Sequence, residues 1–273
     1  MASAAGEHLM LNEIRQLQQY QQRWFRRFTE RPRARLRLFC LAHAGGGARF
    51  FANWAQLLPE SIELVAIQLP GREERIDEPP IEHMTPLVSA ISNALQPWLD
   101  RPYAMFGHSM GAAVAHELCL SIQRQGLPLP LRLLVSGREG PSRNHSSKLH
   151  KASDEDFLAA IMALGGTSPA LRESPELFTL ALPVLRNDYR LIETYHPDPR
   201  RPPLSLPIEV LFGQDDPELH PGDAQAWTLE SSQGVRLHGF HGGHFYLTPQ
   251  CQAVTQCISR CLGEYSPESL EMP

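Results

Sequence analysis

The sequence predicts one large domain of the α/β class, in which a mostly parallel central sheet is flanked by helices. Two observations support this prediction. Short apolar runs alternate with longer amphipathic segments along most of the chain, and this alternation is typical of βαβ units. The chain also has 273 residues, of which 42% are hydrophobic and 20% charged, as in a globular protein large enough to bury a deep core.

Six short runs are predicted to be strands. They consist mainly of apolar residues and are too short for buried helices, so strands within a sheet are the better interpretation. These strands are expected at residues 36–42, 63–69, 102–107, 131–136, 207–212 and 235–240. Between them, apolar residues recur at helical spacing. This pattern predicts helices at residues 49–58, 85–99, 110–125, 222–230 and 248–263.

The alternation is interrupted once, between residues 142 and 200. This stretch has no strand signal, but apolar residues such as Phe157 and Ile161 recur at helical spacings. We expect a helical insertion that lies over the sheet as a mobile lid and lines a pocket with apolar side chains. The rest of the chain after residue 30 is divided into an α/β core, at residues 31–141 and 201–265, and a C-terminal tail, at residues 266–273.

The segment 1–30 differs from the rest in composition. Its apolar residues are spaced near the helical period among glutamine and arginine residues, which predicts an amphipathic N-terminal extension. The residues that form this pattern are Ile14, Leu17, Trp24, Phe25 and Phe28. A basic linker at residues 31–35 contains Pro32 and ends the predicted helix before the first strand.

Charge and composition argue against several classes of function. The net charge of −5 does not suit a nucleic-acid partner. No segment approaches the roughly 20 apolar residues of a membrane span, and no signal peptide is evident, so we expect a cytoplasmic protein. The five cysteines form no CxxC pair and are expected to be small buried residues, not a disulfide framework or a zinc site. Cys257 and Cys261 are nevertheless spaced to share a helix face.

Residues 107–111 have the sequence Gly-His-Ser-Met-Gly and fit the pattern G-x-S-x-G. This pattern is typical of a sharp strand-to-helix turn that exposes a serine hydroxyl above the sheet, with glycines where side chains would collide. The context agrees, because residues 102–106 form a short apolar run and small residues at 112–115 open a helix that can pack close to the sheet. Together these features predict the α/β-hydrolase fold, with Ser109 as nucleophile.

A serine hydroxyl needs a base to take its proton and a third group to orient that base. In this fold the acid and then the histidine follow the serine along the chain. The loop after the strand at 207–212 contains Asp215 and Asp216, and the loop after the strand at 235–240 contains His241 and His244. Position relative to the strands identifies the two loops and leaves both members of each pair as candidates.

Acyl transfer also requires N–H donors aimed at the developing oxyanion. In this fold one donor is the amide after the nucleophile, here that of Met110, and the other comes from a loop after an early strand. The glycine-rich loop His43–Gly47 follows the first long strand and is the natural source of the second donor. This loop lacks the spacing of nucleotide-binding loops, and we expect neither a metal nor another cofactor.

Several motifs together resemble those of the type II thioesterases of nonribosomal peptide and polyketide synthases, relatives of the medium-chain fatty-acid synthase thioesterase. The resemblance extends from about Trp24 to Leu262, and the segment before Trp24 is longer than the family requires. The motifs are Phe39–Gly47 (FCLAHAGGG), Gln68–Arg75 (QLPGREER), Gly107–Gly111 (GHSMG), Leu182–Tyr195 (LPVLRNDYRLIETY), Gly213–Pro217 and Gly243–Leu247 (GHFYL). The second and third motifs together are quite specific.

The resemblance implies roles for particular residues. Ser109 matches the nucleophile of the family, and His244 matches its general base. Ala44 and Met110 match the residues whose amides form the oxyanion hole. The family places its aspartate three residues after the glycine that ends the strand, which identifies Asp216 and leaves Asp215 as the alternative.

The implied activity is hydrolysis of stalled or misprimed acyl groups from the phosphopantetheine arm of an acyl-loaded carrier protein, by an enzyme that acts as a monomer. Carboxylesterases and acyltransferases use the same triad, so only the family motifs favour a thioester substrate. A non-catalytic module that binds carrier proteins is the alternative from another class. The presence of a serine, an acid and a histidine in the required order argues against that module.

Overall fold

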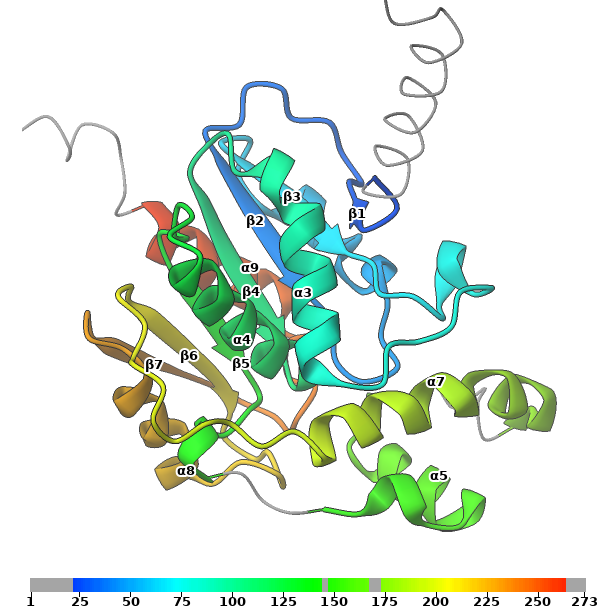
Figure 1. Ribbon diagram of the computed structural model, residues 1–273. Coiled ribbons are helices and arrows are strands. Elements are labelled where there is room, and N and C mark those ends of the chain that lie inside the picture. Colours follow the sequence, from blue (N-terminus) through cyan, green and yellow to red (C-terminus); the bar gives the residue numbers. More distant parts are fainter. Residues whose placement is uncertain (1–21, 144–146, 167–172, 264–273) are drawn as a thin grey trace, which may run out of the picture.

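A computed structural model describes residues 22–143, 147–166 and 173–263 and contains a seven-stranded sheet (Figure 1). The strand order is β1-β3-β2-β4-β5-β6-β7, and all neighbouring strands are parallel except β1 and β3. The strands are β1 Phe25–Arg26, β2 Leu36–Leu41, β3 Ile62–Ile67, β4 Tyr103–His108, β5 Leu133–Ser136, β6 Ile208–Gly213 and β7 Val235–Phe240. The prediction of a mostly parallel sheet is confirmed.

Helices cover both faces of this sheet. α3 and α4 lie on one face and α9 on the other, while α5 and α7 lie together beyond one end of the strands (Figure 1). The helices are α2 Trp54–Leu57, α3 Met84–Leu95, α4 Met110–Arg124, α5 Asp154–Ala163, α7 Pro175–Glu193, α8 Pro221–Gln225 and α9 Cys251–Gly263. Each face of the sheet therefore has its own apolar core.

The inner strands are buried on both faces, which explains why they are continuous apolar runs in the sequence. Every residue of β2, β3, β4 and β5 is buried. Full burial of one large apolar side chain stabilises a fold by roughly 1.5–3 kcal/mol, so these strands contribute much of its stability. β7 lies at the edge of the sheet, and its residues are exposed or partly exposed.

The structure corrects the predicted N-terminal extension. Phe25 and Arg26 form a strand that pairs antiparallel with β3, so the prediction of a helix is wrong for these residues. Trp24 is 0% exposed and Phe25 9%, because both close the edge of the apolar core. The core thus begins before residue 31, where the sequence placed its boundary. The parts of the predicted extension and C-terminal tail at residues 1–21 and 266–273 lie outside the described residues.

Three predicted helices each divide into a shorter α-helix and a 3-10 turn. The helix predicted to reach residue 99 ends at Leu95 and continues as a 3-10 turn, because Pro97 cannot donate a main-chain hydrogen bond and its ring crowds the preceding turn. The other two also divide into an α-helix and a 3-10 turn, the turns being Ala48–Phe51 before α2 and Ala226–Glu230 after α8.

The described part of segment 142–200 contains α5 and α7 and no strand. Both helices begin at a serine cap: Ser153 accepts from the amide of Asp156 at 3.1 Å, and Ser174 accepts from the amide of Leu177 at 3.3 Å. The mobility of this segment stays a prediction. None of the described helices combines the length and the apolar character that a membrane crossing requires.

Candidate active site

The Gly-His-Ser-Met-Gly segment forms a sharp turn between β4 and α4. Ser109 has a φ of 54° and a ψ of −117°, a conformation that residues with side chains rarely adopt. The amide of Ser109 donates to the carbonyl oxygen of Ser136 at 2.8 Å and anchors the turn to β5. The strained turn therefore holds the serine at the N-terminus of α4, as in a nucleophile elbow.

Two glycines make this turn possible. A Cβ atom at Gly107 would lie 2.1 Å from the carbonyl oxygen of Gly111, and a Cβ atom at Gly111 would lie 2.3 Å from the carbonyl oxygen of Leu41. Both distances are far shorter than any real contact, and the obstacles are main-chain atoms that cannot move aside. The G-x-S-x-G pattern is thus a consequence of packing α4 closely against β2.

His244 and Asp216 form a buried pair. His244 Nδ1 lies 2.8 Å from Asp216 Oδ2, and the two residues are 2% and 6% exposed. A carboxylate only accepts hydrogen bonds, so Nδ1 carries the proton and Nε2 keeps its lone pair. This is the tautomer that a general base needs. The other oxygen, Asp216 Oδ1, accepts from the amide of Glu218 at 2.9 Å, which fixes the orientation of the carboxylate.

The alternative residues have different surroundings. Asp215 is exposed, and its Oδ2 atom accepts from the amide of Gly242 at 3.2 Å. His241 is also exposed, whereas His244 is buried. The geometry therefore favours the later member of each pair for the triad.

Ser109 and the two predicted oxyanion donors line one cavity of about 340 Å³. Its wall also includes Glu218. Glu218 Oε2 lies 3.9 Å from His244 Nε2, so the imidazole is next to a residue of the cavity wall. Within the described part of the chain, the amides of Ala44 and Met110 donate to no protein acceptor. Two free N–H groups are what an oxyanion hole offers.

The glycine-rich loop beside Ala44 is held by a buried ion pair. Arg72 makes a two-pronged contact with Asp188 of α7, at 2.6 and 2.8 Å, and the side chains are 7% and 2% exposed. Asp188 also accepts from the amide of Gly45 at 2.7 Å, and Arg72 donates to the carbonyl oxygen of Gly46 at 3.1 Å. The pair thus joins the loop, the Gln68–Arg75 motif and α7.

Two further side chains of the same motif fix the end of this loop. Gln68 Oε1 accepts from the amide of Ala48 at 2.8 Å, and Glu73 Oε1 accepts from the amide of Arg49 at 3.0 Å. Donors that are held in place before the reaction need no reorganisation when the oxyanion forms. The sequence identified the Gln68–Arg75 motif but not these contacts, because the partners of the motif, in the glycine-rich loop and in α7, are distant from it in the chain.

Two other histidines lie close to the base. Burial, together with the nearby His244, lowers the pKa of His43 to about 3 and holds that of His108 well below its usual range. The His108 and His244 rings lie 5.0 Å apart, and His108 Nδ1 is 2.9 Å from Ser136 Oγ. Both neighbours are therefore uncharged near neutral pH and add no positive charge beside the base.

A second cavity, of about 490 Å³, adjoins the first and shares Ala44 and Tyr189 with it. Its walls are mostly apolar and come largely from α7 and from the loops 43–47 and 71–76, with single residues from α5 and from the segment after β7. The apolar residues include Ile161, Leu177, Ala181, Val184, Leu185 and Phe245. A chamber of this kind suits a hydrocarbon chain whose reactive end lies at the serine.

Residues 36–262 match the family model of the thioesterase domain. The chain belongs to this family. The match spans all of the α/β core from β2 to α9 as well as α5 and α7.

Relatives of this thioesterase include enzymes of antibiotic biosynthesis. Thioesterase PikA5 of Streptomyces venezuelae is 37% identical over 86% of this chain and 84% of its own length. A probable cadicidin biosynthesis thioesterase of Streptomyces griseus is also 37% identical, over 88% of this chain and 66% of its own length. Among solved structures, the type II thioesterase BorB from the borrelidin biosynthetic cluster is 39% identical, with a TM-score of 0.79 over 87% of this chain and 96% of its own.

Three of the residues predicted from the sequence, Ser109, Ala44 and Met110, line one cavity of this thioesterase. Asp216 bonds His244, whose Nε2 atom lies 3.9 Å from Glu218 in the wall of that cavity. The α/β-hydrolase fold expected from the sequence agrees with the family and with its solved structures.

Proposed function

We propose that this thioesterase hydrolyses acyl groups, including stalled or misprimed ones, from the phosphopantetheine arm of a carrier protein in a nonribosomal peptide or polyketide assembly line. The observation that carries this proposal is a cavity lined by Ser109 and two free amides, with an aspartate-bonded imidazole 3.9 Å from Glu218 in the cavity wall. The likeness to BorB, a type II thioesterase from a biosynthetic cluster, supports the choice of substrate.

In the proposed reaction, His244 Nε2 takes the proton of the Ser109 hydroxyl as Oγ attacks the thioester carbonyl carbon. The carbonyl oxygen becomes an oxyanion that the amides of Ala44 and Met110 stabilise. Collapse of this intermediate breaks the carbon–sulfur bond, and the sulfur takes the proton from His244 and leaves as a thiol. A water molecule then gives a proton to the same imidazole and attacks the carbonyl carbon of the acyl-serine ester. The bond from this carbon to Ser109 Oγ breaks, Oγ takes the proton from His244, and a carboxylic acid is released. Asp216 holds the imidazole and stabilises its charged form.

The two cavities suggest how the substrate lies. The larger cavity is mostly apolar and suits the acyl chain. The lining of the smaller cavity includes the polar residues Arg138, Glu218 and His220, and this cavity suits the amide-rich arm. The acyl carbonyl would then lie between them, next to Ala44. We further propose that the enzyme acts as a monomer and that it is located in the cytoplasm. The five free cysteines agree with the reducing conditions of that compartment.

One acyl group on three leaving groups tests the substrate class. The acyl-carrier thioester should have a higher kcat/KM than the same acyl group on a short thiol, because the arm and the carrier contribute binding energy. Both should exceed the oxygen ester, because an alkoxide leaves less readily than a thiolate and depends more on protonation. An oxygen ester that matches the carrier thioester would identify an esterase instead.

Ser109→Ala tests the nucleophile in the same assay. Loss of the attacking oxygen should lower kcat by on the order of 10⁶ while leaving the far-UV circular dichroism spectrum unchanged. A variant that retains a tenth of the activity would exclude Ser109 as the nucleophile.

A further inference from the structure

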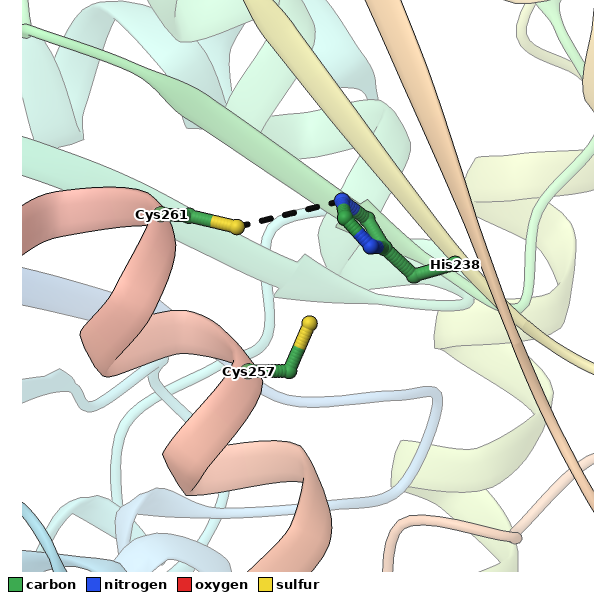
Figure 2. A group of neighbouring side chains, drawn as sticks. All are labelled: His238, Cys257 and Cys261. Carbon is green, nitrogen blue, oxygen red and sulfur yellow. Dashed lines mark hydrogen bonds between the residues drawn. The ribbon is translucent and has the colours of Figure 1, made fainter. Parts of the chain in front are cut away.

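Outside the active site, two thiols and an imidazole face one another between β7 and α9. Figure 2 shows the sulfur atoms of Cys257 and Cys261 turned toward the ring of His238. The three candidate ligand atoms all lie within 4.8 Å of one another, and Cys261 Sγ is 3.8 Å from His238 Nε2. Each cysteine is 5% exposed, and the histidine side chain is 25% exposed. The cluster is therefore shielded but reachable from solvent.

The supporting elements explain this convergence. Cys257 and Cys261 are four residues apart on α9, so their side chains project from the same face of the helix, one turn apart. α9 is anchored through Val254, Ile258 and Leu262, which are buried in the core on this face of the sheet. β7 pairs with β6 from Val235 to Phe240. The three side chains thus come from two elements that are each fixed independently.

The distances fit a tetrahedral zinc ion. Zn–S bonds of about 2.3 Å and Zn–N bonds of about 2.0 Å separate neighbouring ligand atoms by roughly 3.5–3.8 Å. In the structure the candidate ligand atoms all lie within 4.8 Å of one another, and rotation of the cysteine side chains can bring the sulfur atoms to these separations. Two thiolates and an imidazole are ligands that favour zinc over magnesium or calcium.

A buried carboxylate supports the histidine. Glu209 of β6 is 0% exposed, and its Oε2 atom lies 2.7 Å from His238 Nε2. Arg132 bonds the other oxygen, Oε1, and so does Arg236, through Nε at 3.2 Å. Histidine ligands to metals almost always have such a carboxylate or carbonyl partner, which fixes the ring and its tautomer. A proton fixed on Nε2 leaves the lone pair of Nδ1 for the metal.

We propose that His238, Cys257 and Cys261 bind one zinc ion, with a water molecule as the fourth ligand. Binding releases the protons of both thiols, and the two thiolates neutralise the charge of the ion. The ion would join β7 to α9 and fix both ends of the segment 241–250, which carries His244.

Zinc content is the first test. The full chain, purified with a phosphine reductant and dialysed against trace zinc, should hold about one zinc ion per chain by atomic emission. Cys257→Ser and His238→Ala should lose it. Cys251→Ser is the matched control, because it removes a free thiol from the same helix outside the cluster and should retain the ion.

Cobalt titration of the metal-stripped wild-type chain provides a readout that is independent of activity. Bound Co²⁺ should give thiolate-to-cobalt charge-transfer absorption, and zinc should abolish it by displacement. Cys257→Ser should weaken cobalt binding by at least about 100-fold, while Cys251→Ser leaves it unchanged. A wild-type chain that neither holds zinc nor develops this absorption overturns the proposal, whatever the variants do. The same holds if Cys257→Ser and wild type bind cobalt equally.

Discussion

Asp215 and Asp216 are adjacent carboxylates with different surroundings. Only Asp216 is buried against the imidazole of His244, while Asp215 is exposed. Asp216→Asn should lower kcat by roughly 10⁴, since an amide at this position favours the wrong imidazole tautomer. Asp215→Asn should change kcat by less than about threefold. Steady-state kinetics of both variants on one thioester make the comparison, and the reverse ranking would reassign the acid.

Most of the candidate triad could be predicted from local sequence patterns. The Ser109 turn is a continuous motif, and the acid and base follow recognisable strands. The choice within each pair of candidates, Asp215 or Asp216 and His241 or His244, depended on burial and hydrogen bonds, which the sequence does not display. Arg72 and Asp188 were missed as partners because they lie in motifs far apart in the chain. The approach of His238 to Cys257 was missed for the same reason.

The Arg72–Asp188 pair is expected to position the glycine-rich loop His43–Gly47, which carries the proposed oxyanion donor Ala44. Asp188→Asn leaves a buried guanidinium without its charge partner, so it should destabilise the fold by about 3–5 kcal/mol. It should also lower kcat by about 10- to 100-fold with little change in KM, because the loop amides act mainly on the transition state. Urea unfolding and steady-state kinetics measure the two effects.

Arg49→Ala is the control variant. The Arg49 side chain is 67% exposed and forms a surface ion pair with Glu74. Arg49→Ala should change stability by less than about 1 kcal/mol and leave kcat unchanged. If Asp188→Asn changed KM alone, the Arg72–Asp188 pair would act on substrate binding and not on the position of the glycine-rich loop.

At the scale of elements, the buried strands were the easiest to predict and the segment ends the hardest. β2 and β3 are apolar throughout because both faces are covered, so their signal does not depend on periodicity. β1 has only two residues and is defined by pairing with β3, a contact that no local pattern reveals. Aromatic residues near the helical period instead predicted a helix there.

α7 supplies much of the wall of the apolar cavity, so its small residues should set the acyl length that fits. Ala181→Phe fills part of the 490 Å³ chamber. It should lower kcat/KM for long acyl groups by at least about tenfold relative to short ones, because each displaced methylene loses burial. Ala159→Phe, at an exposed position on α5, serves as the control. An unchanged length profile in Ala181→Phe would place the acyl chain elsewhere.

At the scale of the whole molecule, the fully buried His108 and His116 and the partly buried His43 make stability depend on pH. Burial lowers the pKa of His43 and of His116 to about 3 and that of His108 well below its usual value. Below about pH 6.5 the unfolded chain binds protons that the native state does not, so stability should fall as the pH decreases from there toward about 3. Each histidine adds up to about 1.4 kcal/mol per pH unit.

The contribution of one histidine can be isolated at His116, which packs against Trp227, with ring centroids 5.2 Å apart, away from the triad. His116→Gln should reduce the slope of unfolding free energy against pH between about pH 6 and 4 by roughly 1 kcal/mol per unit. His241→Gln changes an exposed imidazole and should leave the slope as in wild type. Urea unfolding at several pH values gives both slopes, and equal slopes would contradict the role of burial.

The position of β1 determines where the chain can be shortened. The carbonyl of Trp24 accepts from the amide of Gln68 at 2.8 Å, and the guanidinium of Arg75 lies 4.1 Å from the Trp24 ring centroid. A truncated chain that starts at Gln22 keeps these contacts. One that starts at Arg31 uncovers the edge of β3 and the motif behind it, so it should lose about 3–5 kcal/mol of stability and expose a strand edge that promotes aggregation. Soluble yield and Tm of the two truncations would define the minimal folding unit.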